Sequence, residues 1–141
     1  MSDRYMAQIT IPKKYIVGKI KEELESYGVD LIDDEGNANT YEDAEAMNGE
    51  FWLEDKLVKE GIPFDRWSEG HYDIVPEMRY FRPAEDGKAA IDLTFEHGAG
   101  IPFTKLKKLI ADDSIDLKAY IDKQLHEDGY YIDIPDIESY K

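Results

Sequence analysis

The stretch PEMRYFRPAEDGKAAIDLTFE, residues 76–96, decides the fold class. From Ile91 to Phe95 every second residue is apolar, which is the period of a strand with one face buried. Residues 83–87 separate this run from the preceding one and have the Pro, Asp and Gly content of a turn. The stretch therefore predicts a β-hairpin formed by residues 76–82 and 88–96.

On either side of the hairpin, short alternating runs predict strands and apolar residues at helical spacing predict helices. No linker-like segment divides the chain, so we expect one acidic α+β domain over residues 1–141, with a mainly antiparallel sheet and three to four helices. The other expected strands are residues 6–11, 29–32, 62–67 and 130–134. The expected helices cover residues 12–27 and 41–59, and two more begin at Pro102 and at Asp113 or Ser114.

Charge is the most informative bulk property of the chain. Its 141 residues include 32 acidic and 17 basic side chains, which gives a net charge of −15. Residues 22–60 hold 14 of the acids against two lysines, whereas residues 1–21 are net positive and residues 61–108 are nearly neutral. A folded domain that exposes this segment would carry one strongly negative face.

Composition excludes several classes of protein. The net charge repels nucleic acid and anionic membranes, so we expect direct binding to neither. The chain has no cysteine, which excludes disulfide scaffolds and thiolate zinc sites. Its hydrophobic content of 42% argues against a disordered acidic chain. Without a membrane-length apolar run or a secretory signal, the sequence predicts a soluble cytoplasmic protein.

The acidic segment is the leading candidate site. Carboxylates held at short spacing on a rigid surface can imitate the phosphates of DNA, and would then occupy a basic groove on another protein. Solubility is the plain alternative for so many acids. The candidate partner-binding residues are Asp30, Asp33, Asp34, Glu35, Glu42, Asp43, Glu45, Glu50, Glu54 and Asp55.

In charge and size alone, the chain is similar to small acidic inhibitors that phages and plasmids make against restriction or CRISPR enzymes. No motif carries this likeness, so it assigns no residue roles. It implies a non-enzymatic binding or inhibitor protein, in which DNA mimicry directs an acidic face onto a nucleic-acid-processing enzyme or a defence complex. The sequence also leaves a homodimer open.

A second candidate surface combines arginines with aromatic residues, which are enriched at protein interfaces. It consists of Arg66, Trp67, Arg79, Tyr80 and Arg82. This group would make the protein a general interaction module. The same arginines could instead hold carboxylates in internal ion pairs, and the sequence leaves both interpretations open.

A third hypothesis is a metal-dependent hydrolase or nuclease. Asp73 and the run Asp86-Gly87-Lys88 loosely match a pattern in which carboxylates hold Mg²⁺ and a lysine stabilises charge, with or without His71. A site assembled from His71, Asp73 and His97 is a variant of this idea. The chain has no nucleophile-elbow, phosphate-loop or dinucleotide motif, so we expect no catalytic residue, no metal and no cofactor.

Overall fold

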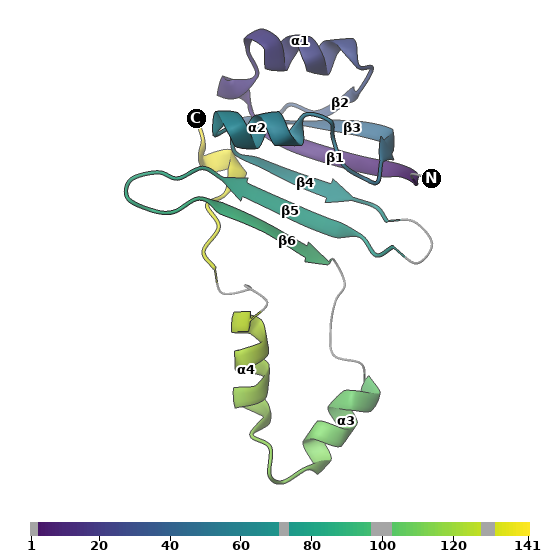
Figure 1. Cartoon of the computed structure of the whole chain (residues 1–141), viewed down its shortest axis with the longest axis vertical. Coiled ribbons are helices and arrows are strands. Elements are labelled where there is room, and N and C mark those ends of the chain that lie inside the picture. The colour runs from purple at the N-terminus through teal and green to yellow at the C-terminus, as the bar shows by residue number, and fades with distance from the viewer. Residues whose placement is uncertain (1–2, 71–73, 97–102, 128–131) are drawn as a thin grey trace. The chain divides into compact units, whose positions relative to one another are not determined.

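The computed structural model describes residues 3–70, 74–96, 103–127 and 132–141. The chain forms two compact units, residues 1–97 with 134–141 and residues 98–133, which we describe separately. The first holds a six-stranded antiparallel sheet and two α-helices, and the second holds two further α-helices (Figure 1). The predicted α+β class, with a mainly antiparallel sheet and up to four helices, is confirmed. The single domain over residues 1–141 stays a prediction.

Strand β1 lies inside the sheet, whose strand order is β2-β3-β1-β4-β5-β6. Every neighbouring pair is antiparallel. The predicted hairpin is present, with Glu77 opposite Glu96 at one end and Arg82 opposite Ile91 at the other. The strands are β1 (Arg4–Pro12), β2 (Asp30–Asp33), β3 (Ala38–Met47), β4 (Phe64–Ser68), β5 (Glu77–Arg82) and β6 (Ile91–Glu96).

One face of the sheet, the helix face, is covered by α1 (Gly18–Ser26) and α2 (Glu54–Glu60) (Figure 1). Strand β1 shows why, because its alternate residues Ala7, Ile9 and Ile11 are apolar and completely buried. The helices contribute the apolar residues that pack against this row. From the helices and the turn before α2 these are Ile20, Leu24, Phe51, Leu53 and Leu57.

We call the opposite face of the sheet the second face. It carries the strand residues that alternate in sequence with the core residues. Strand pairing places Gln8 opposite Trp67, and Tyr80 opposite Leu93, on this face. A C-terminal segment joins the same unit, since the short helix η2 (Ile137–Ser139) contacts β1 and Ile137 is buried. The residues of the second face are half-buried or exposed, except for Arg82 and the paired Pro12 and Ala38, which are buried.

The predicted helix over residues 41–59 is wrong in its first part. Residues Ala38–Met47 form β3, which pairs with β1 on one side and with β2 on the other. This tertiary pairing overrides the helical propensity of the Glu- and Ala-rich run. Thr40 therefore caps no helix, and its hydroxyl bonds instead with that of Thr10 at 2.8 Å.

The last predicted strand, residues 130–134, is also not observed. Tyr130 and Tyr131 lie outside the described residues, and residues 132–134 form no strand. In the second unit, α3 (Phe103–Ala111) and α4 (Leu117–Glu127) confirm the two predicted helices. Asp116, rather than Asp113 or Ser114, caps α4, because its Oδ1 accepts the Ala119 N–H at 3.2 Å.

Candidate functional site

The acidic segment places like charges side by side at one edge of the sheet. Asp30 of the edge strand β2 lies directly opposite Glu42 of β3, and Asp33 lies opposite Thr40. Register with β1 places all of these on the second face, beside Gln8 and Thr10. Directly opposed side chains have Cβ atoms about 5 Å apart, and like charges at that spacing destabilise a sheet.

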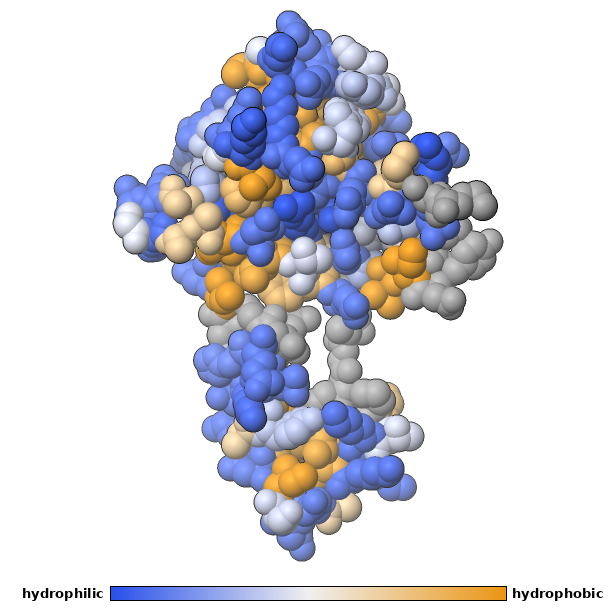
Figure 2. Space-filling model, in the orientation of Figure 1, coloured by the Kyte–Doolittle hydropathy of each residue, from blue (hydrophilic) through white to orange (hydrophobic). Residues whose placement is uncertain are grey.

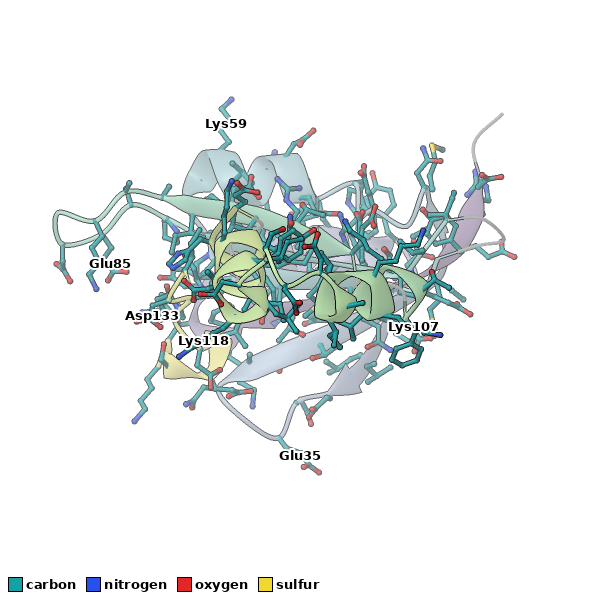
Figure 3. The ribbon with its side chains drawn as sticks, turned by 90° about the horizontal axis from the view of Figure 1, so that it is seen from below. Glu35, Lys59, Glu85, Lys107, Lys118 and Asp133 are labelled. Atoms are coloured by element: carbon teal, nitrogen blue, oxygen red, sulfur yellow. The ribbon has the colours of Figure 1, made fainter. Side chains whose placement is uncertain are left out.

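The turn that follows β2 is held in place by its own polar groups. Asp33 Oδ1 accepts the Glu35 N–H at 3.1 Å, and the Lys13 ammonium bonds the carbonyl of Asp34. Glu138 fixes the far side of the turn by accepting the Asn37 N–H at 2.5 Å. The Glu35 side chain projects from the tip of this turn, away from the sheet (Figure 3). Asp34 and Glu35 are therefore presented from an ordered loop.

We name Asp30, Asp33, Asp34, Glu35 and Glu42 the β2–β3 acidic surface. Four of the five are exposed and Glu42 is half-buried. Among the residues that the structure describes, no basic nitrogen lies within 4.0 Å of any of their carboxylates. Within the described part of the chain, the surface therefore faces solvent and its carboxylates make no ion pairs.

Other predicted acids lie elsewhere. Asp43 is opposite Ala7, so strand pairing turns it toward the helix face. Glu45 and Glu50 lie at and beyond the far end of β3, and Asp55 is exposed on α2. The sequence cluster of ten acids is thus divided between both faces and both ends of the sheet. Only the five residues of the β2–β3 acidic surface follow one another around a single edge.

Glu54 is not part of any exposed surface. It is the first residue of α2, and it is only 3% exposed. Its Oε1 accepts from Arg66 Nε and from Arg79 Nη1, both at 3.1 Å, and its Oε2 accepts the Phe51 N–H at 2.6 Å. Arg66 also reaches Glu77 at 2.8 Å, and Arg79 makes two hydrogen bonds to Asp92. Glu54 therefore ties α2 to β4 and β5.

The ionisation of these arginines reflects the same contacts. Burial lowers the pKa of the Arg66 guanidinium, but the ion pairs with Glu54 and Glu77 outweigh it and leave the pKa raised. The hydrogen bonds to Asp92 and Glu54 likewise raise the pKa of Arg79 in spite of its burial. Both side chains are permanently charged and internally neutralised.

Arg82 is also engaged within the protein. Its guanidinium donates to the carbonyls of Pro135, Phe64 and Phe81 at 2.8–3.1 Å, and its Nη2 lies 2.8 Å from Asp65 Oδ1. Burial raises the pKa of the Asp65 carboxyl, and the Arg82 charge offsets only part of that rise. Arg82 thus anchors the C-terminal segment to the sheet.

The predicted arginine–aromatic group is therefore divided. Arg66 and Arg79 lie on the helix face in ion pairs, whereas Trp67 and Tyr80 lie half-buried on the second face. The Tyr80 ring meets that of Phe95 edge-on, with centroids 6.0 Å apart. Internal ion pairing accounts for the three arginines, and the aromatic residues alone are left as a contact surface.

The hydrolase hypothesis gains no support from the described residues. Asp86 and Gly87 occupy the two central positions of a tight turn, with φ of 49° and 78°, closed by two backbone bonds between Glu85 and Lys88. His71, Asp73 and His97 lie outside the described residues. Within the part of the chain that is described, no three His, Asp or Glu residues are grouped so as to hold a metal ion.

The buried Glu54 network is the feature that sequence reasoning missed. A signal for it was present in the sequence, because a helical spacing over residues 51–58 would place Glu54 on the same face as Phe51 and Val58. A carboxylate on an apolar helix face needs a buried cation. Arg66 lies two residues after buried Phe64 in the same strand, so its side chain is on the buried face as well.

Comparison with known proteins identifies no relative, because no family model, no curated protein and no solved structure matches the chain. No helix in the described part of the chain has both the length and the apolar character needed to cross a membrane.

Proposed function

We propose that this is a non-enzymatic binding protein that docks its β2–β3 acidic surface onto a basic surface of another protein. The observation that carries the proposal is the directly opposed pair Asp30 and Glu42, which is left without a counter-cation among the described residues. A like-charge pair costs folding stability, so a basic partner that neutralises it recovers this cost on binding.

The partner that fits best is a nucleic-acid-processing enzyme or a defence complex. The basic groove of such a protein normally accepts phosphates, and a row of fixed carboxylates offers the same charge. An ordered turn and a paired strand hold Asp33, Asp34 and Glu35, so little conformational entropy is lost on binding. In this proposal the chain is an inhibitor that acts by imitating DNA.

The simpler account of the same residues is protection of a sheet edge. Strand β2 is an edge strand, and charged side chains there prevent pairing with other chains. Edge protection and solubility require only charge, wherever it lies on the surface. Docking requires these particular carboxylates, and this difference is what an experiment can measure.

A second candidate is an interaction module that uses the apolar side chains of the second face. Trp67, Met78, Tyr80, Leu93 and Phe95 come from three adjacent strands and share that face by register. Aromatic residues gathered in this way are typical of the centres of protein interfaces. Alanine at Trp67 would then abolish partner binding, and charge changes at Asp30 would not.

The test compares two triple variants with equal charge. Asp30→Asn, Asp33→Asn and Glu42→Gln remove three of the five charges of the β2–β3 acidic surface. Glu22→Gln, Glu25→Gln and Glu60→Gln neutralise three exposed acids on α1 and at the end of α2. Partners are captured from a host lysate at low and at moderate salt, and each captured protein is then assayed for DNA binding with and without this protein.

We expect a captured protein to lose its DNA in the presence of the unmodified chain. The first triple variant should associate about tenfold more slowly at low salt, since steering depends on local charge, and the control should not. Equal loss in both variants would favour a general charge effect. Capture that withstands salt and both triple variants would contradict docking through the acidic surface.

A further inference from the structure

The α3–α4 unit has apolar faces, but among its described residues none is buried. Neither helix contains a buried side chain. Phe103 is 88% exposed and Ile110 is 63% exposed, although both are large and apolar. Figure 2 shows apolar atoms gathered on the visible face of this unit. The helices have 9 and 11 residues, and isolated helices shorter than about 12–15 residues are marginal in water.

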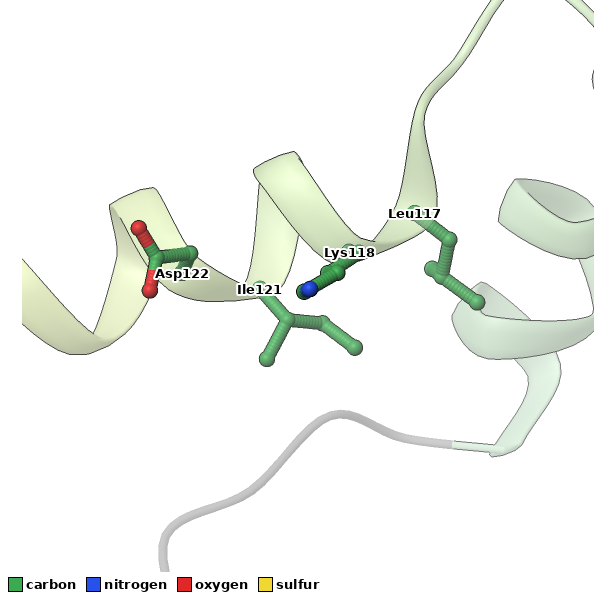
Figure 4. Close-up of a pocket in the computed structure, with 4 residues that line it drawn as sticks. All are labelled: Leu117, Lys118, Ile121 and Asp122. Carbon is green, nitrogen blue, oxygen red and sulfur yellow. The ribbon is translucent and has the colours of Figure 1, made fainter.

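The apolar residues of each helix fall on one side of it. On α3 they recur at a spacing of three or four residues, and Thr104, Lys108 and Ala111 lie on the opposite side. On α4, Leu117 and Ile121 project from the same side, and Asp122 projects from the other (Figure 4). The two apolar stripes consist of Phe103, Leu106, Leu109 and Ile110 on α3, and Leu117, Tyr120, Ile121 and Leu125 on α4.

We propose that this helical hairpin is a dimerisation surface, which packs against the same hairpin of a second copy to form a four-helix cluster. Burying one large apolar side chain removes roughly 60–120 Å² from water. Of the eight stripe residues only Phe103 and Ile110 are exposed, and the other six are already half-buried. Counting those six at about half this area gives roughly 300–600 Å² per copy, which is below the ~800 Å² per partner of a standard interface, so we expect a weak dimer.

The charges of the hairpin complement a second copy. Helix α3 carries three lysines and no acid, and the connection to α4 carries Asp112, Asp113 and Asp116. Lys108 lies on the polar side, so in a two-fold dimer Lys105 and Lys107 of one hairpin would meet the aspartates of the other, in two equivalent places. The five lysines in residues 103–127 equal the five acids there, so two hairpins do not repel one another.

A hollow on α4 gives the interface a specific feature. It measures about 390 Å³ and lies among Leu117, Lys118, Ile121 and Asp122 (Figure 4). Leu117 and Ile121 form its apolar part, which suits a large side chain from another helix as in knobs-into-holes packing, and the charged Lys118 and Asp122 lie at its border. Phe103, with its high exposure, is the side chain that we assign to this hollow in the second copy.

The experiment measures the mass of the full chain by light scattering and by sedimentation over a wide range of concentration. We expect the mass to rise to twice that of one chain. Phe103→Asp and Ile110→Asp should each weaken the dimer at least about 100-fold, because a two-fold dimer loses the buried side chain from both copies. Asp is compatible with the first turn of α3, so the first variant keeps the helix.

Thr104→Asp and Ala111→Asp are the matched controls, because they add the same charge to the same helix on its polar side. Both should dimerise like the unmodified chain, with helix content checked by circular dichroism. A mass of one chain at every concentration overturns the proposal and leaves the apolar face to a different occupant. Equal dimerisation of all four variants overturns it as well. If a variant fails to fold, the mass of the unmodified chain over the same range of concentration still tests the proposal.

Discussion

Replacing Glu54 by alanine tests whether this residue is structural. The change removes the acceptor shared by Arg66 and Arg79, and it also leaves the Phe51 N–H without its partner. Removing one member of a buried ion pair typically costs 3–5 kcal/mol. Arg66 keeps Glu77 and Arg79 keeps Asp92, so we expect the lower end, about 3 kcal/mol of unfolding free energy.

Urea unfolding followed by tryptophan fluorescence and by circular dichroism measures this loss directly. A loss of this size corresponds to a fall in melting temperature of roughly 10 °C for a chain of this length. Asp55→Ala is the matched control, because Asp55 is the next residue and is also in the first turn of α2, but is exposed. Both substitutions lose the same favourable interaction with the helix dipole, so their difference isolates the buried contacts.

The expected difference between the two variants is at least 2 kcal/mol, allowing about 1 kcal/mol for the helix dipole in each. Equal losses for Glu54→Ala and Asp55→Ala would refute the reasoning, because they would mean that Glu54 makes no buried ion pair. A Glu54→Ala protein that still folds should keep its affinity for a partner of the acidic surface. A folded Glu54→Ala protein that lost this affinity would contradict the placement of Glu54 outside the site.

Three further predictions concern charge. Glu42→Gln should raise the unfolding free energy by about 0.2–1 kcal/mol in urea, because it relieves repulsion from Asp30, and a loss of stability would contradict that pairing. The Ser114 hydroxyl and N–H hold the pKa of Asp112 below its ordinary value, so Ser114→Ala should raise this pKa in an NMR titration, whereas an unchanged pKa would argue against the hydroxyl contact. Added salt should weaken capture by a basic partner, because docking through the acidic surface depends on charge, and capture that is equally strong at low and moderate salt would contradict it.

Local patterns were sufficient for the hairpin and for the two C-terminal helices. The alternation from Ile91 to Phe95 and the turn before it identify two adjacent strands without further information. Local patterns predict the wrong structure for residues 38–47. Their Glu and Ala content favours a helix, but they form a strand because they pair with neighbouring strands on both sides. Strand partners distant in sequence decide such a segment.

The candidate site shows the same limit. The sequence shows that acids are concentrated in residues 22–60, but which acids are neighbours depends on register. The pairing of Asp30 with Glu42 joins residues 12 positions apart, and a shift of one residue would turn Glu42 to the other face. Glu54 was grouped with exposed acids because its partners, Arg66 and Arg79, reach it only through the folded sheet.

The interior position of β1 has a consequence for how the chain is made. This strand is synthesised before both of its partners, since β3 and β4 end only at Met47 and Ser68. While the ribosome adds those residues, the apolar row of Ala7, Ile9 and Ile11 has no sheet to join. Folding therefore depends on contacts between residues that are far apart in the sequence, and such contacts form slowly. During that interval strand β1 is the segment that a chaperone would need to shield.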